Sequence, residues 1–276
     1  MDTQSLAKCD VSSNIKDSQD HISYADYLIN DGLHNNRFEL FLQPQFDLAS
    51  GRVVGAESLI RYRKSCGAIC PPYLFIERAE ENGRILEIGQ RVQSLAADIL
   101  CKQPDVKNLL WHISINMSAN ELLTETAFDH LTQLIESLSL TPHNIHVEIT
   151  ETALIEDPKR VINQLDHIKR LGCEVWLDDF GTGFSSLSLL SQLDIDGLKI
   201  DKSFVDKIQQ DDKAFTLCSA IIALAQRLGL AVVAEGIESE EQLLTLAQLG
   251  CDRGQGYLLG KPVPVTDFFK DWPISG

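Results

Sequence analysis

The sequence predicts an α/β fold of the (β/α)8 TIM-like barrel type with an opening antiparallel hairpin, and three observations lead to it. Strand-like apolar runs alternate with helix-like segments along most of the chain, which is the pattern of a mostly parallel sheet. About eight such units in about 240 residues fit a closed barrel better than an open doubly wound sheet. The sequence also lacks the GxGxxG fingerprint of dinucleotide-binding folds, which weakens that alternative.

The opening hairpin is predicted from two strand-like runs joined by a turn. Phe38–Leu42 is the first run and ends at Gln43–Pro44. Asp47–Gly51 has the composition of a turn, and Val53–Tyr62 follows as the second run. We therefore expect these two strands to pair in antiparallel fashion.

The N-terminal residues differ from the rest of the chain. Residues 1–23 are rich in Ser, Asp and Asn and show little hydrophobic pattern, so we expect a flexible tail. A short helix is expected at Ile22–Asn30. Because no linker composition or internal repeat interrupts the remainder of the chain, residues 24–276 are predicted to form one domain.

After the hairpin, helices and strands alternate regularly. The expected strands are Trp111–Met117, Ile145–Thr150, Val175–Leu177, Leu198–Ile200, Ala231–Ala234 and Gly256–Leu259. The expected helices are Tyr73–Asn82, Leu86–Lys102, Ala119–Ser137, Pro158–Leu171, Ser186–Gln192, Asp212–Leu228 and Glu240–Leu249, with a terminal helical piece. The helix that begins at Pro158 is the best bounded, because Asp157 suits the N-cap and Gly172 suits the end of a helix.

Composition limits the function. The formal net charge of −16 argues against binding to polymeric nucleic acid or to an anionic membrane. No apolar run reaches the length of about eighteen residues that spans a membrane, and the N-terminus lacks the features of a signal peptide, so we expect a cytoplasmic protein. Cys66 and Cys70 are the only close cysteine pair. Incidental thiols are favoured over zinc or a disulfide there, because no second pair accompanies them.

Polar side chains stand at the ends of most predicted strands. In a barrel the carboxyl ends of the strands form the active face, so we expect these side chains to converge there. In chain order they are Glu57, Arg61, Asn116, Glu148, Glu151, Asp178, Asp179, Lys199, Asp201, Glu235, Glu238 and Gln255. Alternation supports convergence, because His112 and Asn116 share one face of their strand, as His146 and Glu148 do in the next.

The carboxylates in this set predict a metal site. Several carboxylates cannot converge without compensation, and oxygen donors suit Mg²⁺ or Mn²⁺ better than zinc. The adjacent pair Asp178 and Asp179 allows one residue to bridge two ions, an arrangement that recurs in phosphoester cleavage. The alternative of ordinary solvated charges stays open for any single residue, but the recurrence at successive strands disfavours it for the set.

The same residues carry a family resemblance. Glu57-Ser58-Leu59 followed by Ile60-Arg61 resembles the signature of EAL-domain cyclic di-GMP phosphodiesterases, with Ser58 where the signature has Ala. Further matching motifs occur in the same order, namely Ser114–Leu122, Val147–Thr152, Leu177–Leu190, Leu198–Val205, Val232–Leu243 and Gly250–Pro264. The resemblance covers about residues 37 to 265, and the motifs together are far more specific than the first triplet alone.

The resemblance implies an activity and roles for individual residues. Members hydrolyse cyclic di-GMP to linear pGpG by attack of a metal-activated water, with two Mg²⁺ or Mn²⁺ ions. The ligands of one ion match Glu57, Asn116, Glu148 and Asp178. With Asp178 shared, Asp179 and Glu235 match positions that serve the second ion, directly or through water. Lys199 matches the lysine that contacts the attacking water, and its role as a base or as a permanent cation stays open.

Further matches concern orientation and substrate. Gln255 matches a residue that orients water and metal, and Glu151 matches the anchor of the Asp-Phe-Gly-Thr-Gly loop, which couples metal binding to dimerisation in the family. We therefore assign Glu235, Lys199, Gln255 and Glu151 to catalysis. The residues expected to bind substrate are Gln43, Arg61 and Asp201. The alternatives for Arg61 and Gln43 are a surface salt bridge and a structural hydrogen bond.

These implications leave three hypotheses. The first is an active cyclic di-GMP phosphodiesterase that acts as a homodimer. The second is a cyclic di-GMP receptor or protein-interaction module that does not hydrolyse the nucleotide, although the sequence shows no loss of a ligand position. The third is a metal-dependent barrel enzyme that acts on another phosphoester. Ser58 is expected to be tolerated, since its hydroxyl is small and can bond to nearby backbone.

Overall fold

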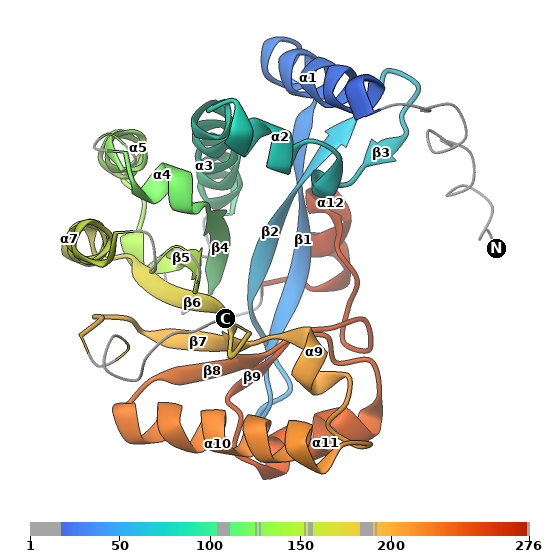
Figure 1. The fold of residues 1–276 in the computed structure, drawn as a ribbon, viewed down its shortest axis with the longest axis vertical. Helices are drawn as coiled ribbons and strands as arrows, with labels where there is room; N and C mark the ends of the chain where they lie inside the picture. The colour runs from blue at the N-terminus through green and yellow to red at the C-terminus, as the bar shows by residue number, and fades with distance from the viewer. Residues whose placement is uncertain are drawn as a thin grey trace.

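The structure, a computed structural model, describes residues 18–103, 111–124, 126, 128–151, 153, 157–182, 190 and 192–274. Within them, eight strands close into a barrel (Figure 1). In chain order they are β1 (Phe38–Asp47), β2 (Val53–Arg63), β4 (His112–Met117), β5 (Ile145–Thr150), β6 (Glu174–Phe180), β7 (Gly197–Ile200), β8 (Ala231–Ala234) and β9 (Arg253–Gly254). The predicted (β/α)8 barrel is therefore confirmed.

One strand of the barrel runs against the others. β1 is antiparallel to β2 on one side and to β9 on the other, whereas neighbouring strands from β2 round to β9 are parallel. The expected opening hairpin is thus the point at which the ring closes. Two short strands extend the sheet beyond the ring, β3 (Ile69–Cys70) on β2 and β10 (Val263–Pro264) on β1.

Helices lie around the outside of the barrel, as Figure 1 shows for α3, α5, α7, α10 and α11. The described helices are α1 (Ser18–His34), η1 (Pro72–Leu74), α2 (Ile76–Glu81), α3 (Ile85–Lys102), α4 (Ala119–Leu122), α5 (Asp129–Leu138), η3 (Pro142–Asn144), α7 (Pro158–Leu171), α9 (Lys202–Val205), α10 (Asp212–Leu228), α11 (Glu240–Gln248) and α12 (Val265–Asp271). The caps expected for α7 are present, because Asp157 accepts a hydrogen bond from the Arg160 amide and Gly172 adopts a left-handed conformation.

Several element predictions need correction. The helix expected at Tyr73–Asn82 is divided into η1 and α2, and β1 does not end at Gln43–Pro44 but continues to Asp47. The first helix begins at Ser18 and not at Ile22, so it reaches into the segment expected to be a tail. The helix expected at Ala119–Ser137 is divided, because α4 ends at Leu122 and α5 begins at Asp129. The last barrel strand is Arg253–Gly254 and not Gly256–Leu259. The helix expected at Ser186–Gln192 and the first 17 residues of the expected tail fall outside the described residues, apart from single positions.

Gly256 explains the last of these corrections. A Cβ atom at this position would lie 2.2 Å from the backbone nitrogen and oxygen of Ile237, so only glycine permits this approach. The amide of Leu258 then donates to the Ile237 carbonyl, and the amide of Leu259 donates to the Gly256 carbonyl. The apolar run after Gln255 therefore turns back over β8 instead of extending the strand.

The hydrophobic core fills the space between the strands and the helices, and outward-facing strand residues such as Ile113, Val147 and Leu198 are fully buried in it. Cys66 is exposed and Cys70 is buried, and both carry free thiols in this structure. Among the residues that the structure describes, no helix has both the length and the apolar character needed to cross a membrane.

Candidate active site

The carboxyl ends of the strands bring together the polar residues that the sequence singled out. Neighbouring strands place Asn116 beside Glu148, and Thr150 beside Asp178. Lys199 lies near the end of β7, and Glu235 follows β8 directly. Alternation turns these side chains into the lumen, where all but Asn116 are largely buried.

Lys199 lies at the centre of a ring of carboxylates. Its Nζ atom is 2.7 Å from Glu148 Oε2, 2.7 Å from Glu235 Oε1, 3.2 Å from Asp178 Oδ1 and 3.7 Å from Glu57 Oε2. The lysine is only 1% exposed. Burial alone lowers the pKa of the Lys199 ammonium, but the attraction of these carboxylates raises it well above its ordinary value. The four carboxylates therefore favour the charged form of Lys199.

Glu57 is held by two amides as well as by the lysine. Asn116 donates to its Oε1 atom at 2.8 Å, and Gln255 donates to its Oε2 atom at 2.6 Å. Burial raises the pKa of the Glu57 carboxyl, but Lys199 and the two amides lower it more, so that its pKa lies below the ordinary value. Glu57 is therefore ionised at neutral pH.

The ring is short of positive charge. Burial, together with the neighbouring carboxylates Glu57 and Asp178, raises the pKa of Glu148 to about 7, although Lys199 opposes the shift. Burial also raises the pKa of Glu235 well above its ordinary value. One ammonium faces four carboxylates, so additional cations would stabilise the ionised form of the ring.

Three carboxylates form a group that fits a metal ion. Asp178, Asp179 and Glu235 each offer an oxygen atom, and these atoms lie within 4.8 Å of one another. Burial and the neighbouring Asp178 and Asp201 raise the pKa of Asp179 to about 6. Asp179 also has a φ of 55°, a left-handed conformation that is unusual for a residue other than glycine and that occurs often at functional sites. The donor set consists of oxygen, as Mg²⁺ or Mn²⁺ prefers.

Two further predicted residues hold the loops around this group. Glu151 is buried and accepts a hydrogen bond from the Gly181 amide at 3.2 Å, which agrees with its predicted role as the anchor of that loop. Asp201 caps α9 by accepting a hydrogen bond from the Ser203 amide at 3.1 Å. Residues 183–189, which continue the loop after Gly181, lie outside the described residues.

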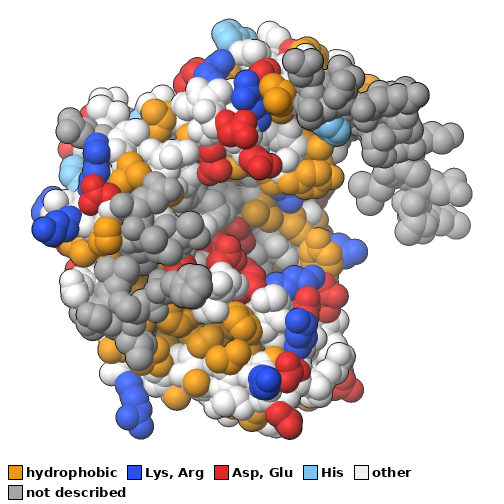
Figure 2. All heavy atoms as spheres, in the orientation of Figure 1, with side chains coloured by type: hydrophobic (Ala, Val, Ile, Leu, Met, Phe, Trp, Pro, Cys, Tyr) orange, Lys and Arg blue, Asp and Glu red, His pale blue; other side chains and the backbone are white. Residues whose placement is uncertain are grey.

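A hollow of about 210 Å³ opens beside the ring. Figure 2 shows acidic side chains gathered near the middle of this face. The residues that line the hollow are Gln43, Glu57, Leu59, Asp178, Lys202, Glu235, Gly236, Glu238, Gln255, Gly256 and Tyr257. Tyr257 is 56% exposed at its mouth, and the ammonium groups of Lys202 and Lys261 lie 5.7 and 5.2 Å from its ring centre. Lys202 is already paired with Glu238, which also lines the hollow, so the exposed aromatic ring and Lys261 are the groups there that suit a phosphorylated ligand with a planar base.

The two residues predicted to contact substrate are positioned differently. Gln43 lines the hollow, and its amide is already engaged, because it donates to the Gly260 carbonyl and accepts from Gln255. Its expected alternative, a structural hydrogen bond, is therefore present. Arg61 lies over the Phe41 ring and donates to the Ile60 carbonyl, so the described contacts do not include the salt bridge that was its alternative. Contact with substrate stays a prediction for both.

Ser58 points away from the ring. Its hydroxyl donates to the Ser114 backbone carbonyl at 2.7 Å, across the pair formed by β2 and β4. This is the backbone hydrogen bond that was expected to make a serine tolerable at this position of the motif.

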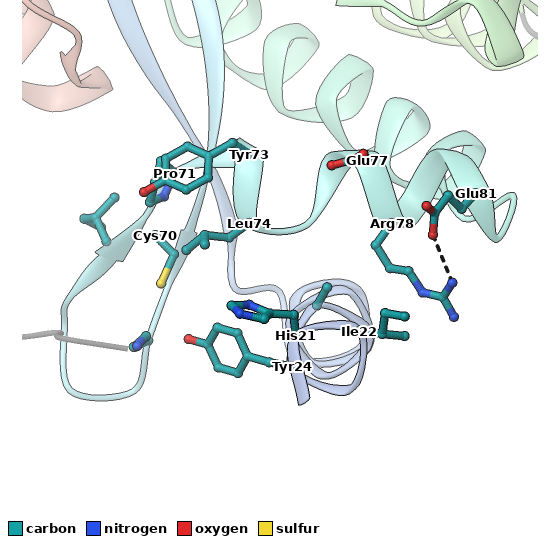
Figure 3. Close-up of a pocket in the computed structure, with 13 residues that line it drawn as sticks. His21, Ile22, Tyr24, Cys70, Pro71, Tyr73, Leu74, Glu77, Arg78 and Glu81 are labelled. Atoms are coloured by element: carbon teal, nitrogen blue, oxygen red, sulfur yellow. Dashed lines mark hydrogen bonds and ion pairs between the residues drawn. The ribbon is translucent and has the colours of Figure 1, made fainter. Parts of the chain in front are cut away.

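A second and larger hollow lies elsewhere, between α1, β3 and α2 (Figure 3). Its volume is about 670 Å³, and His21, Tyr24 and Tyr73 contribute to its lining. Its acidic and basic side chains partly neutralise one another, since Glu81 accepts a hydrogen bond from Arg78 at 3.1 Å. It offers no convergent set of ligands, so the smaller hollow beside Lys199 is the better candidate for chemistry.

Sequence reasoning overlooked several residues that contact the site. Lys202 and Tyr257 line its mouth, and Gln45 lies beneath it, where it donates to Gln255 at 3.0 Å. The signal for Gln45 was alternation, because Gln43 and Gln45 must point to the same side of β1. Tyr257 gave no comparable signal, since its position depends on the turn that follows Gln255.

Comparison with known proteins agrees with this geometry. The EAL domain family model matches residues 28–262. Cyclic di-GMP phosphodiesterase PdeR of Escherichia coli is 35% identical over 245 residues, which cover 89% of this chain and 37% of that protein. Cyclic di-GMP phosphodiesterase RocR of Pseudomonas aeruginosa is 32% identical over 237 residues, which cover 86% of this chain and 60% of that protein. The chain spans only about a third of the length of the first curated relatives that it matches.

Solved structures share the fold. The PaMucR phosphodiesterase in complex with c-di-GMP has a TM-score of 0.84 and 31% identity, and the match covers 89% of this chain and 99% of that one. An EAL domain protein from Listeria monocytogenes has a TM-score of 0.78 and 30% identity, with 91% of this chain and 98% of that one covered. The strand ends that form the carboxylate ring lie within residues 28–262, which the family model matches.

Proposed function

This chain belongs to the EAL domain family, and from that premise we propose that it hydrolyses cyclic di-GMP to linear pGpG. The observation that carries the proposal is the ring around Lys199, in which one buried ammonium faces four carboxylates beside an open hollow. The resemblance of the motifs and the relatives named cyclic di-GMP phosphodiesterases support the choice of substrate.

Two Mg²⁺ or Mn²⁺ ions are part of the proposal. The residues proposed to hold them are Glu57, Asn116, Glu148, Asp178, Asp179 and Glu235. The excess of carboxylates over cations and the short distances among three of these oxygens support a fit to such ions. When bound, divalent ions lower the pKa of water and offset the negative charge that develops on phosphoryl oxygens.

The side chains of the ring have separate tasks in this reaction. Asn116 donates its amide hydrogen to Glu57, so its carbonyl oxygen is the atom left to bind an ion. Gln255 holds the other oxygen of Glu57. Lys199 supplies a fixed positive charge next to the position where charge develops on the phosphate.

The proposed reaction cleaves one of the two phosphodiester bonds of the ring-shaped substrate. Water adds its oxygen to one phosphorus, and the bond from that phosphorus to a ribose oxygen breaks on the opposite side. The leaving oxygen takes up a proton, and the product is linear pGpG. Tyr257 and Lys261 at the mouth of the hollow are placed to contact a base and phosphate of the substrate.

The experiment that tests the function is cyclic di-GMP turnover by the purified chain with Mg²⁺ or Mn²⁺. We expect the parent to release pGpG, and we expect Glu57→Ala and Lys199→Ala to lose nearly all turnover. Glu87→Ala and Lys270→Ala are matched controls, since both side chains are exposed and paired only on the surface. Tight binding without turnover by the parent would favour a receptor, and neither binding nor turnover would refute the proposal.

The proposal also includes a homodimer and a single domain over residues 24–276. Light scattering of the purified chain tests the dimer. A monomer at all accessible concentrations would contradict it.

A further inference from the structure

The lumen below the carboxylate ring contains a layer of flat side chains, which we term the lumen floor (His112, His146, Trp176 and Arg253). The rings of His112 and His146 are stacked with centroids 3.7 Å apart and an angle of 8° between them. The His146 ring is nearly parallel to Trp176 at 5.5 Å, and the Arg253 guanidinium lies 4.9 Å from the Trp176 ring centre. His112 is only 1% exposed and His146 only 2%.

Two glycines make room for these rings. Gly55 pairs with His112 across β2 and β4, and a Cβ atom at Gly55 would lie 2.3 Å from His112 Nε2. Gly197 pairs with Trp176 across β6 and β7, and a Cβ atom there would lie 2.4 Å from the indole ring. Because a ring faces a glycine in both pairs, the positions of the rings are tightly constrained by packing.

A chain of hydrogen bonds connects the lumen floor to the carboxylate ring around Lys199. His112 Nε2 lies 2.8 Å from Gln45 Oε1, and Gln45 Nε2 donates to Gln255 Oε1 at 3.0 Å. Gln255 Nε2 donates in turn to Glu57 Oε2 at 2.6 Å. Gln45 is 1% exposed and Gln255 is 4% exposed, so water does not compete for these amides.

The acceptors around Gln255 determine the direction of the bonds in this chain. Gln255 turns its nitrogen toward Glu57 Oε2 and Gln43 Oε1, at 2.6 and 3.0 Å, and its oxygen toward Gln45. Gln45 must then present its nitrogen to Gln255, which leaves its own oxygen facing His112. Only an imidazole with a proton on Nε2 can satisfy that oxygen.

We propose that His112 is a positioning residue for the reaction, because its Nε2–H fixes the amide of Gln45 and thereby the amide that Gln255 presents to Glu57. This inference rests on the proposed function, in which Glu57 holds a divalent ion. Without a donor at position 112 the Gln45 amide is free to rotate by a half turn. Gln255 then loses the donor to its oxygen, and its orientation depends on the acceptors of its nitrogen alone, Gln43 and Glu57.

The surroundings of His112 fit this task. The stacked His146 ring is itself fixed, since its Nε2 lies 3.0 Å from Glu174 Oε2, the same oxygen that accepts from Trp176 Nε1 at 3.1 Å. Burial and the nearby Arg253 and His143 hold the pKa of His112 well below its usual value. Burial therefore favours the neutral imidazole, whose single N–H, on Nε2, donates to Gln45 Oε1.

The test separates hydrogen bonding from space filling. His112→Gln keeps a donor at about the position of Nε2, whereas His112→Met has nearly the same shape as that variant and no donor. Gln45→Met removes the next link without touching the histidine. The readout is the affinity of the purified chain for Mn²⁺ in a calorimetric titration without nucleotide, followed by kcat and KM for cyclic di-GMP.

We expect His112→Met to weaken Mn²⁺ binding about tenfold, as the loss of a partner behind a metal ligand commonly does. His112→Gln should stay within about threefold of the parent. Gln45→Met should match His112→Met, and the double variant should add little, because both changes break the same chain. In turnover, His112→Met should lower kcat and leave KM nearly unchanged, since substrate contacts are intact.

Equal Mn²⁺ affinity in the parent and all variants would overturn the inference, and so would an equal loss in His112→Gln and His112→Met, which would indicate that His112 only fills space. If His112→Met does not fold, Gln45→Met, which removes the next link without touching the histidine, decides the question, because Mn²⁺ affinity equal to the parent's would overturn the inference. A parent that binds Mn²⁺ but does not hydrolyse cyclic di-GMP would refute the proposed function while leaving this test intact.

Discussion

The carboxylate ring and the lumen floor lie in the same barrel at neighbouring inward-facing positions of the strands, and they differ in charge and in packing. His146, Trp176 and Arg253 each stand two residues before a residue of the ring region, so the two layers are successive inward positions, about 7 Å apart along each strand. The upper layer contains charge that is only partly compensated, whereas the lower layer consists of three stacked rings and one guanidinium that lies over the Trp176 ring. The difference shows that one sheet can hold a charged site above a closely packed layer of flat side chains.

Removal of Lys199 from the carboxylate ring should have the largest effect on turnover of the substitutions considered. Lys199→Met leaves four carboxylates without their cation, and we expect turnover to fall by about 10²–10⁴-fold, the range for loss of a catalytic group. Mn²⁺ should raise the melting temperature of the variant more than that of the parent, because the ion replaces the missing positive charge. Lys270→Met is the control. Turnover above a tenth of the parent value would contradict this expectation.

Removal of Trp176 from the lumen floor should lower the stability of the fold, because packing contacts of a buried ring are lost. The indole is 2% exposed, and Trp176→Ala should lower the free energy of unfolding by about 3–5 kcal/mol in urea titrations. Turnover by the folded fraction should fall far less than in Lys199→Met. Tyr73→Ala, at an aromatic side chain that is 76% exposed, should change stability by less than about 0.5 kcal/mol. A stability equal to the parent would show that the floor does not contribute to the core.

The two layers should also differ in the sign of their pH dependence. The folded pKa of His112 lies well below 6.5, so the unfolded chain binds a proton first as the pH falls, and stability present above pH 6.5 is lost below it. The slope is at most about 1.4 kcal/mol per pH unit for this one group. Glu148, with its pKa raised to about 7, has the opposite effect, because its contribution to stability is lost as the pH rises toward 7.

His112→Met isolates the contribution of the lower layer. In urea titrations with a chelator present, the parent should lose stability between about pH 6.5 and 5.5 more steeply than the variant. Identical slopes in the two proteins would mean that His112 does not resist protonation in the folded chain.

The smallest effect is expected outside the lumen. Ser58→Ala removes a buried hydrogen bond to the Ser114 carbonyl and should lower the free energy of unfolding by about 1 kcal/mol. Turnover should change by less than about tenfold, or roughly 1.4 kcal/mol, because the side chain points away from both layers. A larger rise in turnover would show that the serine impairs the neighbouring Glu57.

Much of the upper layer could be predicted from the sequence, because alternation along each strand is a local property. The order of strands and the positions of Glu57, Glu148 and Lys199 at their ends were sufficient to expect a convergent set of side chains. The same alternation placed His112 and His146 on the lumen side. It gave no indication of their function, since a histidine in a strand is compatible with many environments.

The features that could not be predicted depend on contacts between distant parts of the chain. The stacking of His112 on His146, the approach of Gln45 to Gln255 and the turn after Gln255 each join strands that are far apart in sequence. The last strand was misplaced for this reason, because an apolar run that packs against Ile237 resembles a strand in sequence. The division of the helix after Ser118 was missed because the capping box at Ser118 begins only the short helix α4, which ends at Leu122.

The paired glycines of the lumen floor restrict how its sequence can change over time. A side chain cannot be added at position 55 while His112 is present, nor at position 197 while Trp176 is present, because each added Cβ would overlap a ring. The aromatic side chain must therefore be replaced first and the glycine afterwards. Substitutions at the two positions of each pair are thus ordered in evolution, and relatives are expected to carry either a ring opposite a glycine or two side chains of intermediate size.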